Sequence, residues 1–509
     1  MKSTMRFGLF CLVVAISGSS MAAVRLPAIL GDNMVLQQKT EAPIWGWADP
    51  QEAVKVKGSW AETEVAAQAG ADGKWRVKLP TPAAGGPFTV TIAGSNTITL
   101  QNVLVGVVWV CSGQSNMQFS VRSSNNAEAE IAAANYPKIR LFDLKRTVAE
   151  TLQPDCKGSW QPCTPETVPD FSAVAYYFGR DLNKQLDIPV GLIHTSWGGT
   201  PAESWTRREI LAADEDFAPI LKRFDEAMVK FPAAMEEYNT KTLVEWQQKT
   251  DQAKAESKEA PRKPNAPMGP DSPWRPAGLY NAMIAPLIPF AIDGAIWYQG
   301  ESNAGRAWQY QKLFPAMINN WRADWGRGDF PFYFVQIAPY VDQNPEIREA
   351  QLVAFKTVAN TGIVVTTDIG DPKDIHPRNK QDVGRRLALW ALSKNYGLKD
   401  IVPSGPIYRE IKVEGDKVRV FFDFAGNGLL ARNGEPTHFT IAEDGKDFVP
   451  AKAVIDGSTI VVSAEGVKAP VAVRFAWENA PEPNLFNKEG LPASPFRTDA
   501  RPGKTDGQK

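Results

Sequence analysis

The sequence predicts an α/β protein in which a three-layer α/β/α domain lies between two β-sandwich-like modules. Three patterns support this prediction. Apolar and polar residues alternate near both ends of the chain, near-continuous apolar runs lie between those ends, and helical stretches follow these runs. With 509 residues and 43% hydrophobic content, the chain is long enough to form roughly two to four domains with their own cores.

The chain begins with a segment that has the layout of a cleaved secretory signal. Lys2 and Arg6 precede a short apolar run, and small residues end the segment near Ala22 and Ala23. The run is too short to span a bilayer, and no later segment reaches the roughly 18 unbroken apolar residues that a membrane helix needs. We therefore expect residues 1–23 to be removed and the mature protein to be periplasmic or secreted, without a membrane span.

Both ends of the mature chain have the period-two patterning of β-strands. Turn signals rich in glycine separate the alternating segments, as in a β-sandwich. Near the N-terminus these segments are 53–57, 75–79, 88–92 and 97–100, and near the C-terminus they are 418–422, 459–462 and 471–475. The pattern predicts an N-terminal β module over residues 24–104 and a C-terminal β module with a tail over residues 401–509.

The central region, residues 105–400, has the pattern of a mostly parallel sheet covered by helices on both faces. Its apolar strands are 105–110, 190–193, 294–297, 332–335 and 362–365. Functional residues of such sheets gather at the carboxyl ends of the strands. A helical insertion is expected at residues 207–276, where a charged helical stretch precedes a proline-rich loop. This insertion is expected to be a solvated excursion or, alternatively, a lid.

The composition argues against nucleic-acid and anionic-lipid partners. Lysine and arginine (56) nearly balance aspartate and glutamate (57), so the molecule has no basic field that would attract polyanions. The 16 tryptophans favour either platforms for sugar rings or packing in cores and interfaces. A neutral or weakly charged partner, such as a carbohydrate, fits this composition better.

Three cysteines remain once the predicted signal is removed: Cys111, Cys156 and Cys163. Cys156 and Cys163 lie seven residues apart in a stretch that contains proline, glycine and aspartate. In an oxidising compartment they form either a small-loop disulfide or two free thiols. So few cysteines and histidines disfavour a structural metal site, and we expect no metal.

A candidate nucleophile lies just past the first apolar strand of the central region. The strand 105–110 leads into Cys111-Ser-Gly-Gln-Ser-Asn-Met-Gln118, so Ser115 follows a glycine-containing turn. A serine at this place can expose its hydroxyl at the sheet edge while backbone N–H groups face the space above it. Ser112 is expected to be a turn residue, and Cys111 adjoins an apolar strand where a buried, inert thiol is common.

A serine nucleophile needs a base, and the sequence offers three histidines. His438 lies in the predicted C-terminal β module, where an ordinary strand or turn residue is expected. His194 ends the run 190–193 and is expected to be a hydrogen-bonded structural residue, with access to the sheet edge as the alternative. His376 lies in an acidic loop after the run 362–365. It is the favoured base because a nearby aspartate can hold the tautomer of its imidazole.

Four sequence blocks, in this order, point to one family. They are Gly113-Gln-Ser-Asn-Met117, Trp197-Gly-Gly-Thr200, Trp297-Tyr-Gln-Gly-Glu-Ser-Asn303 and Asp374-Ile-His-Pro377. The flanking segments 31–37 and 494–499 extend the match over nearly the whole mature chain. With these blocks the chain resembles the sialate O-acetylesterase family of the SGNH hydrolases. The resemblance implies an SGNH-type three-layer hydrolase domain for residues 105–400.

The resemblance also implies roles for individual residues. Ser115 matches the family's nucleophile, and His376 matches its base. Gly199 matches the glycine whose N–H would join the N–H of Ser115 in the oxyanion hole. In the third block, Gln299 is the candidate side-chain donor to the oxyanion, and Asn303 is the second candidate.

The sequence does not determine which acidic residue orients His376. Many SGNH enzymes place it three residues before the histidine, and here that position is Lys373. Asp374 is our candidate for the residue that orients His376. Asp371 is the alternative, and a Ser-His pair with a backbone carbonyl as partner is the third possibility.

The resemblance implies a carbohydrate O-acetylesterase that acts through a Ser-His(-Asp) acyl-enzyme without a metal or organic cofactor. O-acetylated sialic acid is the implied substrate, and an acetylated plant polysaccharide such as xylan is the alternative. A sialate carboxylate would favour an arginine partner, either Arg306 or Arg122. Further residues near these blocks are candidates for contacts with the sugar: Glu301, Asn303, Arg306, Trp197, Trp205 and Trp308. For each of them, packing or local hydrogen bonding within the protein is the alternative interpretation.

A noncatalytic carbohydrate-binding protein is the alternative from a different functional class. The two β modules and the tryptophans are compatible with it. Ser115 and His376, each in its family context, argue against it.

Overall fold

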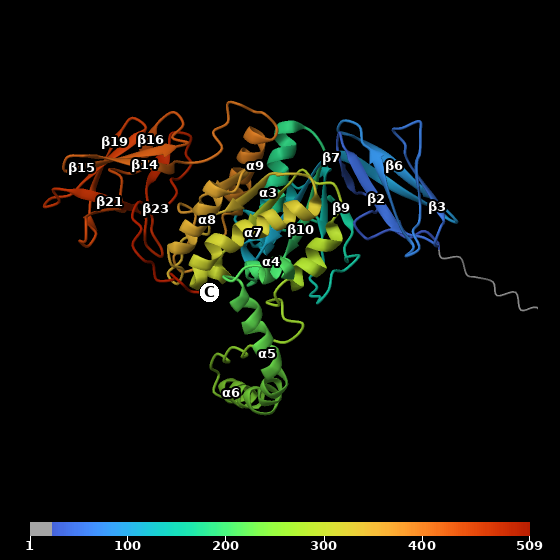
Figure 1. The fold of residues 1–509 in the computed structure, drawn as a ribbon, viewed down its shortest axis with the longest axis horizontal. Coiled ribbons are helices and arrows are strands. Elements are labelled where there is room, and N and C mark those ends of the chain that lie inside the picture. Colours follow the sequence, from blue (N-terminus) through green and yellow to red (C-terminus); the bar gives the residue numbers. More distant parts are fainter. Residues whose placement is uncertain (1–22) are drawn as a thin grey trace, which may run out of the picture.

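The computed structural model describes residues 23–509, so the predicted signal lies outside the described residues except for Ala23. The described chain forms a row of three bodies, with a β module at each end and an α/β domain between them (Figure 1). A helical arm projects from the central body. Within residues 23–509, no helix is both long enough and apolar enough to cross a membrane.

The central domain is built on a mostly parallel sheet, as the sequence predicts. In spatial order its strands are β13 (Thr361–Val364), β12 (Phe332–Val335), β11 (Gly294–Tyr298), β7 (Thr97–Gly113), β10 (Val190–Ser196), β8 (Tyr136–Asp143) and β9 (Trp160–Cys163). Only β9 pairs antiparallel to its neighbour. Every residue of β10, β11 and β12 is buried, which explains their nearly continuous apolar sequences.

Helices cover both faces of this sheet. Trp109 on β7 pairs with Gly294 on β11, so Trp297, three residues further along β11, points to the opposite face. The ring of Trp109 lies 5.0 Å from Phe178 of one helix, and the ring of Trp297 lies 5.8 Å from Trp321 of another. The first face therefore holds α3 (Ala173–Leu186) packed on α9 (Lys380–Lys394), and the second holds α7 (Ala307–Trp325) packed on α8 (Glu346–Thr357).

A single long strand joins the N-terminal module to the central sheet. The first part of β7 pairs with β6, and its second part pairs with β10 and β11. The expected boundary at residues 104 and 105 therefore falls inside one continuous strand. The other strands of this module are β1 (Val35–Gln37), β2 (Glu41–Trp47), β3 (Ala53–Gly58), β4 (Val65–Gln68), β5 (Lys74–Pro80) and β6 (Gly85–Ala93). Burial alternates strictly along β3 and β5, in agreement with the period-two pattern.

The C-terminal module contains two four-stranded sheets and a strand pair. One sheet has the order β14-β15-β20-β19, the other has the order β18-β17-β21-β23, and β16 pairs with β22. The strands are β14 (Ile407–Glu414), β15 (Lys417–Asp423), β16 (Leu429–Ala431), β17 (Phe439–Glu443), β18 (Val449–Pro450), β19 (Lys452–Asp456), β20 (Thr459–Ser463), β21 (Pro470–Phe475), β22 (Leu485–Asn487) and β23 (Phe496–Arg497). The ring of Phe496 contacts Phe422 from the first sheet and Phe475 from its own, so aromatic packing joins the two sheets.

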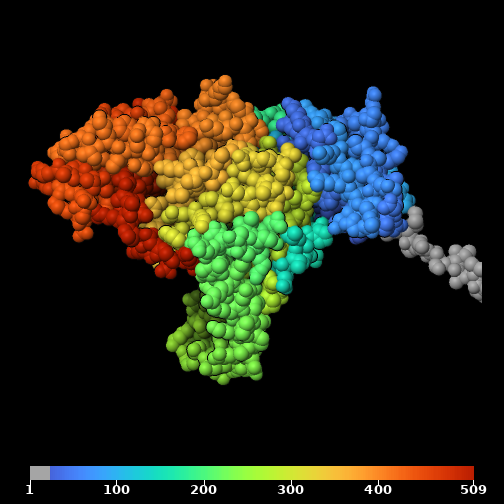
Figure 2. All heavy atoms as spheres, viewed as in Figure 1, coloured from blue at the N-terminus to red at the C-terminus, as the bar shows by residue number. Residues whose placement is uncertain are grey.

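The predicted insertion forms the projecting arm (Figures 1 and 2). It contains α4 (Arg208–Ala212), α5 (Ala218–Glu237), a π-helical turn (Tyr238–Thr242) and α6 (Leu243–Ala255). The proline-rich segment returns along these helices, because Tyr238 and Trp246 donate hydrogen bonds to backbone carbonyls of that segment. Short helical segments elsewhere are α1 (Ser115–Gln118), α2 (Ala127–Ala132) and 3₁₀ or π turns at Val121–Ser123, Ala202–Trp205, Tyr280–Ile284, Ala285–Leu287 and Glu301–Arg306.

Candidate active site

The turn that ends β7 places Ser115 at the edge of the central sheet. Gly113 has a φ of +142°, and a Cβ atom there would lie 2.2 Å from the carbonyl oxygen of Tyr298 on β11. Only glycine allows this close approach. The backbone then enters α1, so Ser115 begins a short helix directly above the carboxyl end of the strand.

Ser115 and His376, which are 261 residues apart in sequence, form a hydrogen-bonded pair. The distance between Ser115 Oγ and His376 Nε2 is 2.8 Å. His376 lies in the loop between β13 and α9, and its ring stacks on Phe119 with 6.5 Å between ring centroids. This is the geometry in which an imidazole can accept the proton of an attacking serine.

The acidic residue beside this pair does not contact the imidazole closely. Asp374 Oδ1 is 3.8 Å from His376 Nδ1, beyond hydrogen-bond distance, but it accepts a hydrogen bond of 2.9 Å from the backbone N–H of His376. The alternative acid, Asp371, accepts a hydrogen bond from the backbone N–H of Lys373. Partial burial, then the charge of Lys380, lowers the pKa of His376, and Asp374 opposes this shift. A lowered pKa keeps the imidazole neutral, as a general base requires.

Backbone donors for an oxyanion lie next to Ser115. The N–H of Ser115 is in the first turn of α1, where N–H groups have no partner within the helix. Gly198 approaches closely, since a Cβ atom there would lie 3.2 Å from Ser115 Cβ, and its N–H donates to Gln118 Oε1 at 2.7 Å. Gly199, the glycine favoured from the sequence, has a φ of +74° and no atom within 4 Å of where a Cβ would lie. The contact between Gly198 and Gln118 could not be predicted from the sequence, because adjacent glycines look equivalent in a motif and the partner lies 80 residues away.

Ser115 and His376 line a cavity of about 830 Å³. Its walls combine carboxylates, cationic side chains and an aromatic ring, so they offer a ligand both hydrogen-bonding groups and an apolar surface. The other lining residues are Gln118, Phe119, Ser120, Ser123, Asp143, Leu144, Lys145, Arg146, Asp170, His194, Ser196 and Gly198. Lys145 and Arg146 were not predicted from the sequence, although they lie just after the carboxyl end of β8 at the same edge of the sheet. The described residues of the insertion at 207–276 do not line this cavity.

The chain matches a known protein family over more than half of its length. Residues 105–262 and 269–393 match the family described as "Carbohydrate esterase, sialic acid-specific acetylesterase". The chain belongs to this family. The match confirms the resemblance seen in the sequence and identifies the protein as an ester hydrolase.

Relatives of the esterase cover nearly its whole length. It is 32% identical to the sialate O-acetylesterase of Rattus norvegicus, over 96% of each chain. It is 29% identical to the Homo sapiens sialate O-acetylesterase, over 94% of each chain. Among solved structures, a carbohydrate acetylesterase from Xanthomonas citri is similar, with a TM-score of 0.79, 33% identity, and coverage of 94% of this chain and 100% of that one.

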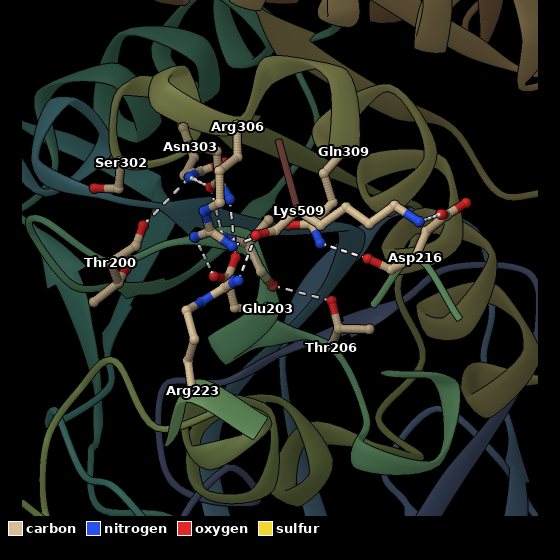
Figure 3. Close-up of polar contacts among 12 residues, drawn as sticks. Thr200, Glu203, Thr206, Asp216, Arg223, Ser302, Asn303, Arg306, Gln309 and Lys509 are labelled. Atoms are coloured by element: carbon tan, nitrogen blue, oxygen red, sulfur yellow. Dashed lines mark hydrogen bonds and ion pairs between the residues drawn. The ribbon is translucent and has the colours of Figure 1, made fainter. Parts of the chain in front are cut away.

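Several residues that the sequence put forward lie in a buried polar network of the esterase. Gln299 is fully buried, and its Nε2 donates to Asn303 Oδ1 at 2.6 Å, so this amide does not face the cavity. Asn303 Nδ2 donates to Glu203 at 2.8 Å, and Arg306 forms an ion pair of 2.6 Å with the same carboxylate. Figure 3 shows Asn303 and Arg306 pointing toward Glu203. These three candidates are held by protein partners and do not line the cavity around Ser115.

The three tryptophans that were candidates for sugar contacts lie in different environments. Trp205 is fully buried, and Trp308 packs under the ammonium group of Lys509. Trp197 is half-buried next to the cavity residues Ser196 and Gly198, and the Arg146 guanidinium lies 5.9 Å from its ring. Of the tryptophans considered, only Trp197 lies directly beside cavity-lining residues in the described chain.

Two other residues that the sequence put forward have other environments. Glu301 is buried and accepts a hydrogen bond of 2.7 Å from Asn116, so it contacts the residue next to the nucleophile. Arg122 forms an exposed ion pair of 2.6 Å with Asp170. Neither Glu301 nor Arg122 lines the cavity.

His194 is hydrogen-bonded through both ring nitrogens, as expected for a structural histidine. Its Nδ1 lies 2.6 Å from Asp143 Oδ1, and its Nε2 lies 2.6 Å from Ser196 Oγ. All three side chains line the same cavity as Ser115. They give this wall a fixed set of hydrogen-bonding groups.

The other residues weighed as nucleophiles are inaccessible. Ser112 and Cys111 are fully buried within β7, and burial raises the pKa of the Cys111 thiol well above its usual range. Cys156 and Cys163 are free thiols, which is the second of the two alternatives that the sequence left open. Among residues 23–509, no group of three or more His, Cys, Asp or Glu side chains is arranged to hold a metal ion.

The position of Asp374 leads to a prediction for the substitution Asp374→Asn. The asparagine keeps an oxygen acceptor for the His376 backbone N–H and removes only an exposed charge. We expect kcat/KM to fall by no more than about fivefold, since exposed pairs typically contribute up to about 1 kcal/mol. The acidic limb of the pH profile should move to lower pH, because Asp374 raises the pKa of His376.

Rates of acetyl-ester hydrolysis measured across pH 4–9, with Asp371→Asn as the matched control, check this prediction. The control should resemble the wild type. A thousandfold loss in Asp374→Asn alone would show that Asp374 moves onto Nδ1 in the substrate complex and acts as a full triad acid.

Proposed function

We propose that this protein removes O-acetyl groups from carbohydrates, with Ser115 as the nucleophile and His376 as the general base of an SGNH-type site. The main observation in favour is the 2.8 Å contact between Ser115 Oγ and His376 Nε2 at the edge of a cavity of about 830 Å³. The cavity is large enough for a sugar with its acetyl group. Membership of a carbohydrate esterase family supports the same reaction.

The reaction is a two-step acyl transfer. Ser115 Oγ attacks the acetyl carbonyl carbon while His376 Nε2 takes the hydroxyl proton. The tetrahedral adduct collapses, the bond between the carbonyl carbon and the sugar oxygen breaks, and Nε2 returns the proton to that oxygen. Water then gives a proton to Nε2 and attacks the acetyl-serine. The second adduct collapses with cleavage of the bond between the acetyl carbon and Ser115 Oγ, and Nε2 returns its proton to Oγ. Acetic acid leaves and loses its remaining proton to solvent.

The negative charge on the carbonyl oxygen is held by backbone N–H groups in this proposal. Ser115 provides one donor from the first turn of α1, and Gly199 provides another, because the N–H of the neighbouring Gly198 already donates to Gln118. A donor of this kind typically lowers the activation free energy by about 3 kcal/mol. Gln299 would have to break its contact with Asn303 to take part, so we assign the oxyanion to backbone donors.

O-acetylated sialic acid is the proposed substrate, because the curated relatives are sialate O-acetylesterases and the cavity contains two cationic residues. Lys145 and Arg146 can pair with the sialate carboxylate. Arg306, a candidate from the sequence, is already paired with Glu203, and Arg122 is paired with Asp170. Acetylated xylan has no carboxylate on its xylose units and would offer Arg146 no anionic partner.

The substitution Arg146→Gln tests this assignment. For O-acetylated sialic acid we expect KM to rise about tenfold. This corresponds to the lower end of the binding free energy of a hydrogen bond to a charged group, because Arg146 is exposed to solvent. For acetylated xylan and for 4-nitrophenyl acetate, KM and kcat should stay near wild-type values. Steady-state acetate release from the three substrates measures the effect. A wild-type preference for xylan, or equal losses on all three substrates, would overturn the sialate assignment.

We also propose that the protein is exported, on the basis of the signal-like residues 1–23. An N-terminal sequence of the purified protein that begins at Met1 would contradict export by cleavage.

A further inference from the structure

A buried lysine lies next to the loop that carries His376 and takes no part in the reaction steps above. Lys380, near the start of α9, is fully buried. Its ammonium group donates to Asn116 Oδ1 and to the carbonyl oxygen of Pro377, both at 2.6 Å. The rings of Phe119 and Tyr298 lie 4.7 and 5.5 Å away. Burying a charged group is costly, so a lysine at this position needs a reason beyond filling space.

Asn116 extends the contacts of Lys380 to the other side of the histidine loop. It directly follows Ser115, and its Nδ2 donates to the carbonyl oxygen of Ile375 at 3.0 Å and to Glu301 Oε1 at 2.7 Å. Both Asn116 and Glu301 are buried. The residue next to the nucleophile is therefore hydrogen-bonded to the loop that carries the base, through one partly buried contact at Ile375 and one buried contact at Lys380.

The carbonyls on both sides of His376 are held by this network. Asn116 binds the one at Ile375, and Lys380 binds the one at Pro377. We propose that Lys380, Asn116 and Glu301 form a clamp that fixes His376 relative to Ser115. The clamp orients the imidazole through its backbone, a task that a triad acid performs through Nδ1 in other serine hydrolases.

The three clamp residues are positioning residues, since none of them contacts Ser115 Oγ or the imidazole ring by hydrogen bond. The inference rests on the proposed function, because it assigns the clamp to the Ser115–His376 reaction. It also accounts for the distance of 3.8 Å between Asp374 and Nδ1, since the loop is held without that contact.

The charge of Lys380 affects the pKa of His376, so the clamp can be tested through the pH dependence of the rate. The titratable groups that act on one another here are Lys380, Glu301, Asp374, His376 and Tyr298. Burial lowers the pKa of Lys380 to about 7, and Lys380 in turn lowers the pKa of His376. Removal of the Lys380 charge must raise the pKa of His376.

The substitution Lys380→Met tests the clamp, with Lys394→Met as the matched control at the exposed end of the same helix. We expect Lys380→Met to lower kcat/KM for 4-nitrophenyl acetate about a hundredfold, since misplacement of a reacting group by about 1 Å has an effect of this size. The acidic limb should also move to higher pH, because the charge of Lys380 lowers the pKa of His376. Lys394→Met should resemble the wild type in both measurements.

Asn116→Ala provides a second variant in case Lys380→Met does not fold, as judged by circular dichroism and thermal unfolding. It should lower kcat/KM by a similar factor but move the acidic limb less, because Lys380 keeps its charge. If both residues act in one clamp, the double variant should lose little more than either single variant.

Three outcomes would overturn the clamp: an unmoved acidic limb in folded Lys380→Met, near-wild-type rates in Asn116→Ala, or fully additive losses in the double variant. These results are distinct from a failure of the proposed function. If Ser115→Ala stays active, the proposed reaction itself fails; if it is inactive while Lys380→Met behaves as the wild type, only the clamp fails.

Discussion

Replacing Ser115 with alanine is expected to lower kcat for acetyl-ester hydrolysis by about 10⁴- to 10⁶-fold, the range for loss of a serine nucleophile. No other serine hydroxyl is hydrogen-bonded to His376 in the described chain. The folded state should be nearly unaffected. Ser115 is only partly buried and its one side-chain hydrogen bond is to His376, so the free energy of unfolding should change by less than about 1 kcal/mol.

Acetate release by equal amounts of folded wild type and Ser115→Ala measures this loss. Ser112→Ala is the matched control, because Ser112 precedes Ser115 by three residues, is fully buried, and has an Oγ atom without a hydrogen-bond partner among the described residues. The control should keep its rate within a few-fold of the wild type. Equal rates for wild type and Ser115→Ala would favour the alternative of a noncatalytic carbohydrate-binding protein.

Replacing His376 with alanine is expected to have a comparable effect, with kcat lowered by about 10⁴-fold or more. The imidazole is the only side chain positioned at Ser115 Oγ, within the described residues, to take its proton. The wild-type kcat/KM should rise with pH as His376 loses its proton, with a midpoint below the ordinary pKa of histidine because burial and Lys380 lower it. This acidic limb should disappear from the residual activity of the variant.

His438→Gln is the control for the histidine substitution. His438 pairs with Glu478 at 3.1 Å in the C-terminal module, so the change should leave the rate and the pH profile unchanged. If His376→Ala kept a wild-type acidic limb, another group would have to be the base. His194, already bonded to Ser196, would then be the next residue to test.

Local sequence patterns were sufficient to predict the layout of the fold. Strict alternation in residues 53–57 and 75–79 corresponds to strands with one buried face, and continuous apolar runs correspond to strands with both faces covered. These patterns are local because side-chain direction along a strand repeats every two residues. The glycine-rich turn before Ser115 was likewise recognisable, since its backbone geometry depends on the residue that occupies it.

Side-chain partners in the site were predicted less well. Gln299 was favoured as an oxyanion donor, yet its amide is bonded to Asn303, and Arg306 is paired with Glu203. A motif shows which residues occur in a turn, but it does not show which of their side chains point inward. That depends on the neighbours supplied by other elements.

The sequence by itself determined the strands of the central sheet, the family, and the pairing of Ser115 with His376, which was favoured by elimination among three histidines. Only the tertiary structure decided that Asp374 stands 3.8 Å from the imidazole, that Arg146 lines the cavity, and that Lys380 is buried against Asn116. The physical reason is that hydrophobic periodicity acts over a few residues. Contacts between positions 116 and 380 instead require the order of the parallel strands and the packing of α9 to bring distant segments together.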